Sequence, residues 1–252
     1  MPELRLTVVG PGPAYTRRRG RTSSCYVVEG GGTRIVLDIG HGSFASLGAR
    51  WDPRSIDGIF ISHLHADHHI DLVAMRHYLK YAQATEGSVP LIAPAGIRAR
   101  YDVLNGIAGF LDPLPGPELT AGVHSVGSLS VEARRVTHTD DSYAFRVALQ
   151  GDGPALVYSG DCGRPEDLLA MVRAGDTLLS EAAWGAIEPV EAAWHLTAAQ
   201  AAGVARAGGV RRLILTHVLD EGRPQTTLRI ARRAFDGPTD LAAPGMEVVV
   251  ND

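Results

Sequence analysis

Short apolar segments separated by glycine-rich turns dominate the first half of the chain. They have the length of strands, and most are rich in β-branched residues, which favours strands over helices. The expected strands are Leu4–Val9, Ser24–Val28, Arg34–Leu37, Gly58–Ile61 and Val89–Ala93. Apolar residues recur with helical spacing in Ile70–Gln83 and Gly96–Phe110, which predicts two helices there.

The second half of the chain repeats this pattern. Its expected strands are Leu129–Val136, Tyr143–Leu149, Ala155–Tyr158, Thr177–Leu179 and Leu213–Leu215. Helices are expected at Pro165–Arg173 and Thr197–Ala207, with Thr197 as an N-cap. Two strand-rich halves with interspersed helices predict an α/β fold in which two sheets pack together under covering helices.

The proline-rich segment Leu111–Pro117 is either the connection between the two halves or a loop near a functional site. Neither a low-complexity tract nor a linker composition interrupts the sequence. Residues 1–252 are therefore expected to form a single domain.

Charge and cysteine content narrow the possible function classes. A net charge of -4 argues against general binding to nucleic acids or anionic membranes, both of which favour an excess of Lys and Arg. Cys25 and Cys162 are the only cysteines, which excludes a disulfide framework and a cysteine-based zinc site. The sequence shows no signal-peptide pattern and no apolar run long enough to cross a bilayer, so a cytoplasmic location is expected.

Basic residues gather in one glycine- and proline-rich segment near the start of the chain. Arg17, Arg18, Arg19 and Arg21 lie together there. The segment is either a solvated loop or a loop that binds phosphate, and the sequence leaves both interpretations open.

The most informative stretch follows the apolar run at 58–61. It reads His63-Leu64-His65-Ala66-Asp67-His68 and contains four residues of the kind that bind metals. Imidazoles and a carboxylate bind divalent ions of the zinc type, and their close spacing lets one turn present ligands in two directions. The pattern predicts a hydrolytic metal centre at the rim of a sheet, with a solvated polar turn as the competing interpretation.

Three further segments place a metal-type residue just after an apolar strand. They are Val136-Thr137-His138, Ser159-Gly160-Asp161 and Thr216-His217. Because α/β proteins form their ligand crevices beyond the ends of strands, we expect these residues to converge at one edge of a sheet.

With these segments the chain resembles the metallo-β-lactamase superfamily and, within it, the ribonuclease Z-like branch. Asp38-Ile39-Gly40-His41-Gly42 is similar to the DxGxG turn of that family, and Tyr158-Ser159-Gly160-Asp161 and Leu215-Thr216-His217 follow in family order. The resemblance implies an αββα sandwich that binds two divalent ions. The implied ligands are His63, His65 and His138 for one ion, Asp67, His68 and His217 for the other, and Asp161 as the bridge.

Zinc is the expected metal, with manganese or iron as alternatives. Redox di-iron members of the superfamily carry an acidic residue where His65 stands, so the imidazole at this position favours zinc-type hydrolysis. Asp67 would then both bind metal and orient the attacking water. Asp38 is expected to fix its turn by hydrogen bonding, and His41 is a candidate for supporting the ligands from outside.

The segment Trp194-His195-Leu196-Thr197 looks like the ribonuclease Z-like motif in which a histidine precedes a threonine-capped helix. Leu179-Ser180-Glu181-Ala182 looks like the His-Glu-Ala-Thr motif of that branch, with Ser180 in place of the histidine. By resemblance, His195 is a general acid or a phosphate contact, and Glu181 orients it. An ordinary helix-entry residue is the alternative for His195.

A site with two metal ions and an acid suits an anionic phosphodiester. The arm with which ribonuclease Z grips tRNA would lie between His138 and Asp161, where this chain has room for only two strands and a turn. The favoured function is thus a phosphodiesterase acting on a small molecule or a short nucleotide. The alternatives are a carboxylic ester, lactone or thioester hydrolase, a tRNA 3′-processing endonuclease, and a non-catalytic binding or sensing protein. No membrane partner is expected, and the resemblance makes a homodimer reasonable.

Overall fold

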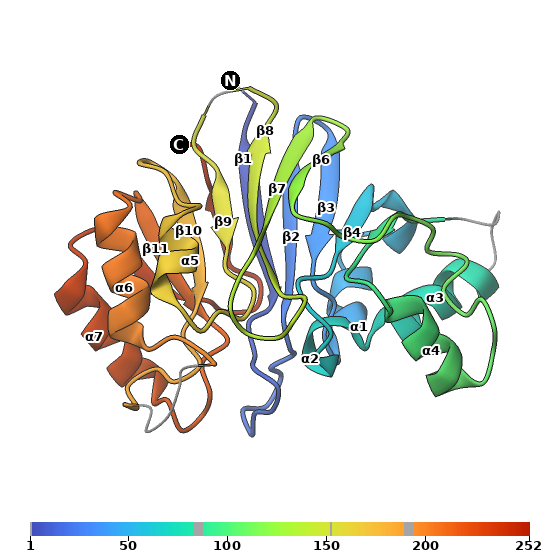
Figure 1. Cartoon of the computed structure of the whole chain (residues 1–252), viewed down its shortest axis with the longest axis horizontal. Coiled ribbons are helices and arrows are strands. Elements are labelled where there is room, and N and C mark those ends of the chain that lie inside the picture. Colours follow the sequence, from blue (N-terminus) through green and yellow to red (C-terminus); the bar gives the residue numbers. More distant parts are fainter. Residues whose placement is uncertain (1, 83–87, 152, 189–193) are drawn as a thin grey trace.

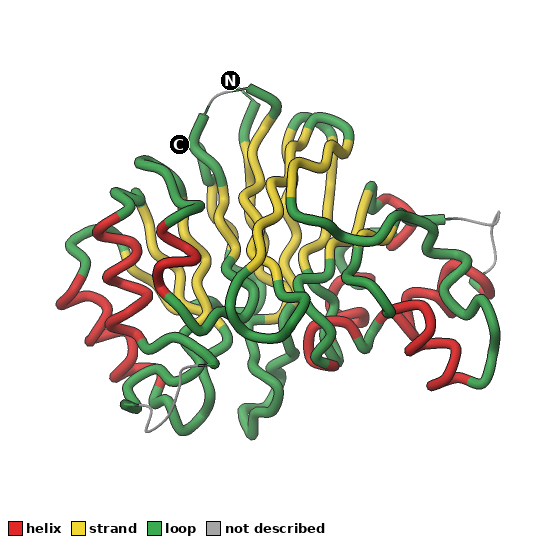
Figure 2. Tube along the Cα trace, in the orientation of Figure 1, coloured by secondary structure: helices red, strands yellow, loops and turns green. Residues whose placement is uncertain are grey.

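Two β-sheets lie face to face in the centre of the protein, and helices cover the outer face of each (Figure 1). The computed structural model describes residues 2–82, 88–151, 153–188 and 194–252. A tube coloured by secondary structure shows the same layers, with strands between two groups of helices (Figure 2). Both sheets contain parallel and antiparallel pairs, so the predicted sandwich of two mixed sheets is confirmed.

The first sheet is formed mainly by the N-terminal half of the chain. Its strands are ordered β13-β1-β2-β3-β4-β5. Their bounds are Leu4–Gly10 for β1, Cys25–Gly30 for β2, Thr33–Leu37 for β3, Gly58–Phe60 for β4, Leu91–Ile92 for β5 and Glu247–Val249 for β13. Strands β3, β4 and β5 run parallel to one another.

The second sheet is ordered β12-β11-β10-β9-β8-β7-β6. Its strands are β6 Gly122–Val126, β7 Leu129–Arg135, β8 Tyr143–Leu149, β9 Leu156–Tyr158, β10 Thr177–Glu181, β11 Arg212–Thr216 and β12 Thr239–Leu241. Strand β8 is antiparallel to both of its neighbours, so β7 runs in the same direction as β9, β10 and β11. The carboxyl ends of these four strands therefore lie at one edge of the sheet.

Helices cover the two outer faces in chain order. The first sheet is covered by α1 Ser43–Gly48, the 3-10 helix η1 Pro53–Ser55, α2 Ala66–His69, α3 Leu72–Tyr81 and α4 Ile97–Asn105. The second sheet is covered by α5 Pro165–Leu169, α6 Ala198–Ala207 and α7 Pro224–Ala234. Helix α6 has the expected N-cap, because the side chain of Thr197 accepts a hydrogen bond from the backbone N–H of Gln200.

Alternation along the strands separates the interior into layers. In β1, Leu4, Leu6 and Val8 point into the core between the sheets. In β2, Tyr26 joins the same core, whereas the next residue, Val27, packs under the helices of the first sheet. This period of two is what a strand buried on both faces requires.

Several elements differ from the predicted bounds. The helix expected at Ile70–Gln83 corresponds to α3, which begins at Leu72, and the short helix α2 lies before the predicted range. Asp71 just before α3 is held by the segment at the start of α1: its backbone N–H donates to Ile39 O and its carboxylate accepts from Phe44 N. Gln83 lies outside the described residues. Helix α4 ends at Asn105 because Gly106 adopts a left-handed conformation with φ 63°.

The end of α5 and the path of the proline-rich segment can also be compared with the prediction. Helix α5 ends at Leu169, whereas the prediction extended it to Arg173. The segment Leu111–Pro117 leads from α4, which covers the first sheet, towards β6 of the second, and its Pro115 O accepts from Leu91 N of β5. The first of its two interpretations, a connection between the halves, is confirmed.

Candidate metal centre

The seven predicted ligand residues lie together where loops leave the carboxyl ends of four strands. His138 follows β7, Asp161 follows β9 and His217 follows β11 at one edge of the second sheet. The HxHxDH turn, which begins at His63, follows β4 of the first sheet. The expected convergence at a sheet edge is what the structure shows.

One group of side chains surrounds a single position. His63 Nε2 and His138 Nε2 each lie 3.6 Å from Asp161 Oδ2. His65 Nδ1 lies 3.1 Å from His138 Nε2. One ligand atom from each of these four residues is within 4.8 Å of the others, so together they could hold one metal ion.

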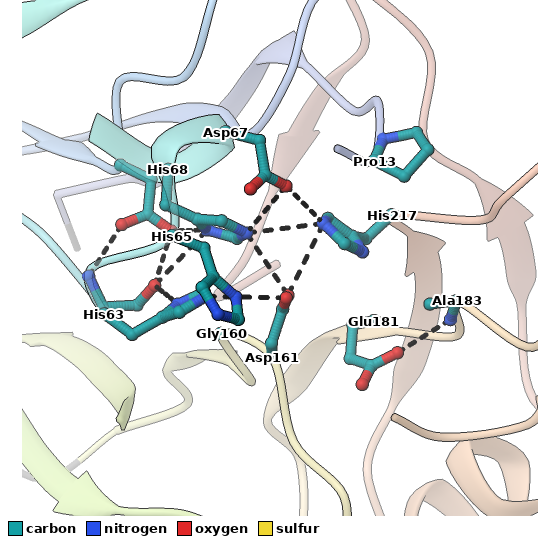
Figure 3. A network of polar contacts seen from close by, with 12 residues as sticks. Pro13, His63, His65, Asp67, His68, Gly160, Asp161, Glu181, Ala183 and His217 are labelled. Carbon is teal, nitrogen blue, oxygen red and sulfur yellow. Dashed lines mark hydrogen bonds and ion pairs between the residues drawn. The ribbon is translucent and has the colours of Figure 1, made fainter. Parts of the chain in front are cut away.

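A second group lies on the other side of Asp161. Asp67 Oδ2 is 3.1 Å from His217 Nε2 and 3.4 Å from His68 Nε2. Asp161 turns its other oxygen, Oδ1, toward these imidazoles at 3.4 Å from His68 Nε2 and 3.6 Å from His217 Nε2. Figure 3 shows this carboxylate between the two groups. The geometry permits a second ion, with Asp161 as the shared residue.

The hydrogen bonds of the buried atoms fit metal binding. Among the described residues, His63 Nε2 and Asp161 Oδ1 are buried without a hydrogen-bond partner. Such atoms are rare in folded proteins because each forfeits its hydration. Burial lowers the pKa of His63 well below its ordinary value, and burial likewise lowers the pKa of His65 and of His138. Three imidazoles are thus held in the neutral form that binds metals.

Charge distinguishes the second group. Burial raises the pKa of Asp67, but hydrogen bonds and charges from His217 and His68 outweigh it and hold this carboxyl well below its ordinary range. Burial lowers the pKa of His68, but Asp161 and Asp38 outweigh it and raise the value well above the ordinary one. The carboxylates of this group therefore favour a positive charge at the position where a metal cation would bind.

Asp38 holds the ligands from behind. Its fully buried carboxylate accepts hydrogen bonds from Ser62 N at 2.7 Å, Ser62 Oγ at 2.8 Å, His68 Nδ1 at 2.7 Å and the Tyr158 hydroxyl at 2.6 Å. Ser62 Oγ in turn lies 3.1 Å from His63 Nδ1. Because its own hydrogen is donated to Asp38, Ser62 Oγ accepts from His63, which leaves His63 Nε2 unprotonated toward Asp161. Sequence reasoning missed Ser62 and Tyr158.

Backbone contacts fix two further ligands. His138 Nδ1 lies 2.7 Å from Trp194 O, an arrangement that keeps its proton on Nδ1 and frees Nε2 for the metal. His217 adopts a left-handed conformation with φ 57°, and its N–H donates to Pro11 O at 3.1 Å. Residues other than glycine rarely adopt this backbone conformation, and such backbone strain is common at functional sites.

Gly40 explains why the DxGxG turn carries glycine. A Cβ at Gly40 would lie 1.8 Å from Asp67 O and 2.7 Å from the Ser23 side chain. Only glycine therefore lets this turn pack against the HxHxDH turn.

His195 and Glu181 form a pair beside the two groups. His195 Nδ1 lies 3.1 Å from Glu181 Oε1 and 3.9 Å from Asp161 Oδ2. Glu181 is fully buried and also accepts from the backbone N–H groups of Cys162, Ala183 and Leu196. Four donors thus lock the carboxylate that orients the imidazole.

The charge of this pair favours a proton on His195. Burial lowers the pKa of His195, but the hydrogen bond and charge of Glu181 and the charge of Asp161 outweigh it and raise the pKa to about 9. With Nδ1 directed to Glu181, Nε2 is the atom from which the imidazole can give a proton.

The other candidates lie outside this arrangement. His41 is exposed and contacts Ser23 Oγ, and the described contacts of its ring include none with the ligand residues. His69 is a packing residue whose Nδ1 lies 2.9 Å from the buried Tyr101 hydroxyl. Cys162 is buried, and burial raises the pKa of its thiol, which keeps it protonated and unreactive.

The described part of the chain contains no helix long and apolar enough to cross a membrane.

Comparison with known proteins agrees with the geometry. A family model described as a β-lactamase superfamily domain matches residues 33–218. The uncharacterized protein Rv1339 of Mycobacterium tuberculosis is 30% identical over 81% of this chain and 77% of its own length. The ribonuclease Z of Myxococcus xanthus is 24% identical over 97% of both chains.

A solved structure shows the same fold. The metallo-β-lactamase fold protein YhfI of Bacillus subtilis superposes with a TM-score of 0.86 at 19% identity, covering 98% of this chain and 99% of YhfI. The predicted resemblance to the metallo-β-lactamase superfamily and its ribonuclease Z-like branch is confirmed by these matches. The chain belongs to the β-lactamase superfamily and is a hydrolase of the metallo-β-lactamase fold.

Proposed function

We propose that this protein is a phosphodiesterase that uses two zinc ions to hydrolyse a small or flexible phosphodiester. The ions would be held by the seven ligand residues of the candidate metal centre, with Asp161 between them. When bound, two such ions activate water and stabilise the negative charge that develops on the phosphoryl group. Only two carboxylates, Asp67 and Asp161, are present among the ligands, so the loaded site keeps a net positive charge that favours an anionic substrate.

Asp67 has a second role in this proposal. Its Oδ2 lies within 3.4 Å of both His68 and His217, and its low pKa keeps it ionised throughout the neutral range. An ionised carboxylate at this position accepts a hydrogen bond from the attacking water and turns its lone pair toward phosphorus.

The observation that carries the proposal is the pair of His195 and Glu181 beside Asp161. Hydrolysis of an alkyl phosphodiester expels an alkoxide, which needs a proton as the bond breaks. His195 is held by a buried carboxylate at 3.1 Å, so its imidazolium is oriented and its charge is stabilised before substrate arrives. A thioester expels a thiolate, which leaves without such an acid, so the pair favours the phosphodiester over a thioester. A lactone also expels an alkoxide, but it is uncharged, and the net positive charge of the loaded site favours the anionic phosphodiester over it.

The connection between His138 and Asp161 supports a small substrate. Strand β8 ends at Leu149 and β9 begins at Leu156, and Arg146 pairs with Val157 across the hairpin. Residues 150–155 alone connect the two strands, and Asp152 within the expected turn lies outside the described residues. This short hairpin is consistent with the absence of the arm that ribonuclease Z uses to grip tRNA.

A substrate panel tests the proposal. Zinc-loaded protein is assayed with bis-p-nitrophenyl phosphate, 2′,3′-cyclic nucleotides, a series of lactones and thioesters, and precursor tRNA. We expect turnover of the first two and no processing of tRNA. Turnover of lactones or thioesters alone would overturn the phosphodiesterase assignment, and tRNA cleavage would overturn the size restriction.

Elemental analysis tests the metal content independently of activity. We expect two zinc ions per chain in the loaded protein. Fewer than two would contradict the dinuclear arrangement, and the absence of any turnover with full metal content would favour a binding or sensing protein.

A further inference from the structure

A cavity of about 280 Å³ lies beside the loop between β1 and β2, the blue loop that extends beyond the sheet edge in Figure 1. This loop carries the basic segment that the sequence left as either a solvated or a phosphate-binding loop. Its lining includes Arg18 and Arg21, Gln225 at the start of α7, and the apolar side chains of Leu215, Val218 and Leu241.

The two arginines differ in their partners. Arg18 Nε donates to Asp220 Oδ1 at 2.6 Å, and Arg18 Nη2 donates to Val218 O at 3.1 Å, so a carboxylate neutralises its charge. Arg21 lies on the same turn, since its N–H donates to Arg18 O at 3.3 Å. Throughout the described residues, the Arg21 guanidinium forms neither an ion pair nor a hydrogen bond.

The Arg21 guanidinium is partly buried, and the described residues place no carboxylate beside it. Partial burial, followed by the nearby charge of Arg18, lowers the pKa of Arg21. An anion in the cavity could therefore bind this guanidinium, because charge-assisted hydrogen bonds from arginine to a phosphate are strong and frequently bidentate.

Helix α7 contributes to the same field. It begins at Pro224 and runs for 11 residues, and Pro224 and Gln225 of its first turn also line the cavity. The amino end of a helix carries partial positive charge. The lining of the cavity thus combines two arginines, the amino end of a helix and apolar side chains.

We propose that this cavity binds the phosphate group of a small ligand, with Arg21 as the residue that binds its charge. The site is separate from the metal centre but adjoins it, because Thr216, which precedes the ligand His217, also lines the cavity. The volume suits a phosphate group with a small apolar portion rather than a polymer. The phosphate belongs either to the far end of the substrate or to a separate small molecule.

Calorimetric titration with inorganic phosphate tests the proposal on the zinc-loaded protein at constant ionic strength. We expect two classes of binding site, one at the metal centre and one in the cavity. Arg21→Gln should weaken the second by about tenfold or more, since a hydrogen bond to a charged group contributes about 1.5–3 kcal/mol. Zinc content and the first class of site should remain unchanged.

Arg19→Gln is the matched control. Arg19 lies on the same segment, carries the same charge and is exposed, and it does not line the cavity. Arg19→Gln should bind phosphate like the wild type, and Arg21→Lys, which keeps the charge, should retain part of the affinity. Equal affinity in wild type and Arg21→Gln, or equal losses in Arg19→Gln and Arg21→Gln, would overturn the proposal.

A kinetic comparison identifies the source of the phosphate. If the phosphate is part of the substrate, Arg21→Gln raises KM for a diester that carries a terminal phosphomonoester and leaves KM for bis-p-nitrophenyl phosphate unchanged. If KM for both diesters is unchanged while the calorimetric site is lost, the cavity binds a separate molecule. The calorimetric measurement does not require turnover, so its outcome is independent of whether the protein has the proposed phosphodiesterase activity.

Discussion

Replacement of His195 by alanine tests whether this residue donates a proton in the reaction or only supports the structure of the site. The imidazole is tied to Glu181 at 3.1 Å and its side chain is 19% exposed. After His195→Ala, Glu181 still accepts hydrogen bonds from the backbone N–H groups of Cys162, Ala183 and Leu196 at 2.7–3.1 Å. The buried carboxylate therefore stays satisfied, and we expect little loss of stability or of metal.

The loss of activity should depend on the leaving group. A positioned general acid typically contributes a factor of about 10²–10⁴, which corresponds to roughly 3–5 kcal/mol in the activation barrier. An alkoxide needs the proton, so kcat for a 2′,3′-cyclic nucleotide should fall by about that factor in His195→Ala. A p-nitrophenolate leaves without a proton, so kcat for bis-p-nitrophenyl phosphate should fall far less.

The assay compares kcat for the two substrates in wild type and His195→Ala, with zinc measured in the same samples. The ratio of the two losses is the informative quantity, because a general disturbance of the site would reduce both equally. Equal losses would refute the role of His195 as a general acid. Loss of zinc in His195→Ala would assign the residue to metal binding, in accord with its position near Asp161 and His217.

Two further predictions concern pH and metal content. Burial lowers the pKa of His195, but Glu181 and Asp161 raise it to about 9, so the imidazole is protonated below that pH. For substrates that expel an alkoxide, kcat should therefore fall as the pH rises through about 9. If the same fall at high pH persists in His195→Ala, it does not come from His195. Asp161→Ala should reduce bound zinc below one ion per chain by elemental analysis, because Asp161 faces both groups of imidazoles. As a control, replacement of the exposed Asp57 by alanine should keep the full zinc content. Undiminished zinc in Asp161→Ala would exclude the bridging role.

The strands of the core were predictable because a buried strand is recognisable from the apolar residues of its own short segment. Strand β8 at 143–149 is apolar at every position but Arg146, and in the run 4–9 the apolar residues alternate with Arg5 and Thr7 before the pair Val8 and Val9. Strand β6 was missed because it is largely exposed, with Val123 68% accessible. Helix α7 was also missed. Its apolar residues lie on one face, but only Thr227 and Ala231 of its 11 residues are buried, and arginine and other polar residues occupy most of the segment.

Candidate ligands were predictable for a related reason. The HxHxDH turn places four metal-type residues within six positions, and the remaining ligands each follow an apolar strand. The supporting contacts have no such local signal. Tyr158 donates to Asp38 across 120 positions, and Arg18 contacts Asp220 across 202 positions. A tyrosine or an arginine at such a position has many possible roles until the fold brings its partner beside it.

Geometry at the site therefore depends on residues that bind no metal. Asp38 and His217 both adopt left-handed conformations, with φ 59° and 57°, that neither residue prefers in isolation. Four hydrogen bonds to the Asp38 carboxylate and the bond from His217 N to Pro11 O offset that strain. Because these contacts join β3, β4, β9 and the loop after β1, the ligand positions are set by the packing of the two sheets against each other. The same loop carries Arg21, so a phosphate group bound in the cavity would act on the segment that holds the backbone of His217.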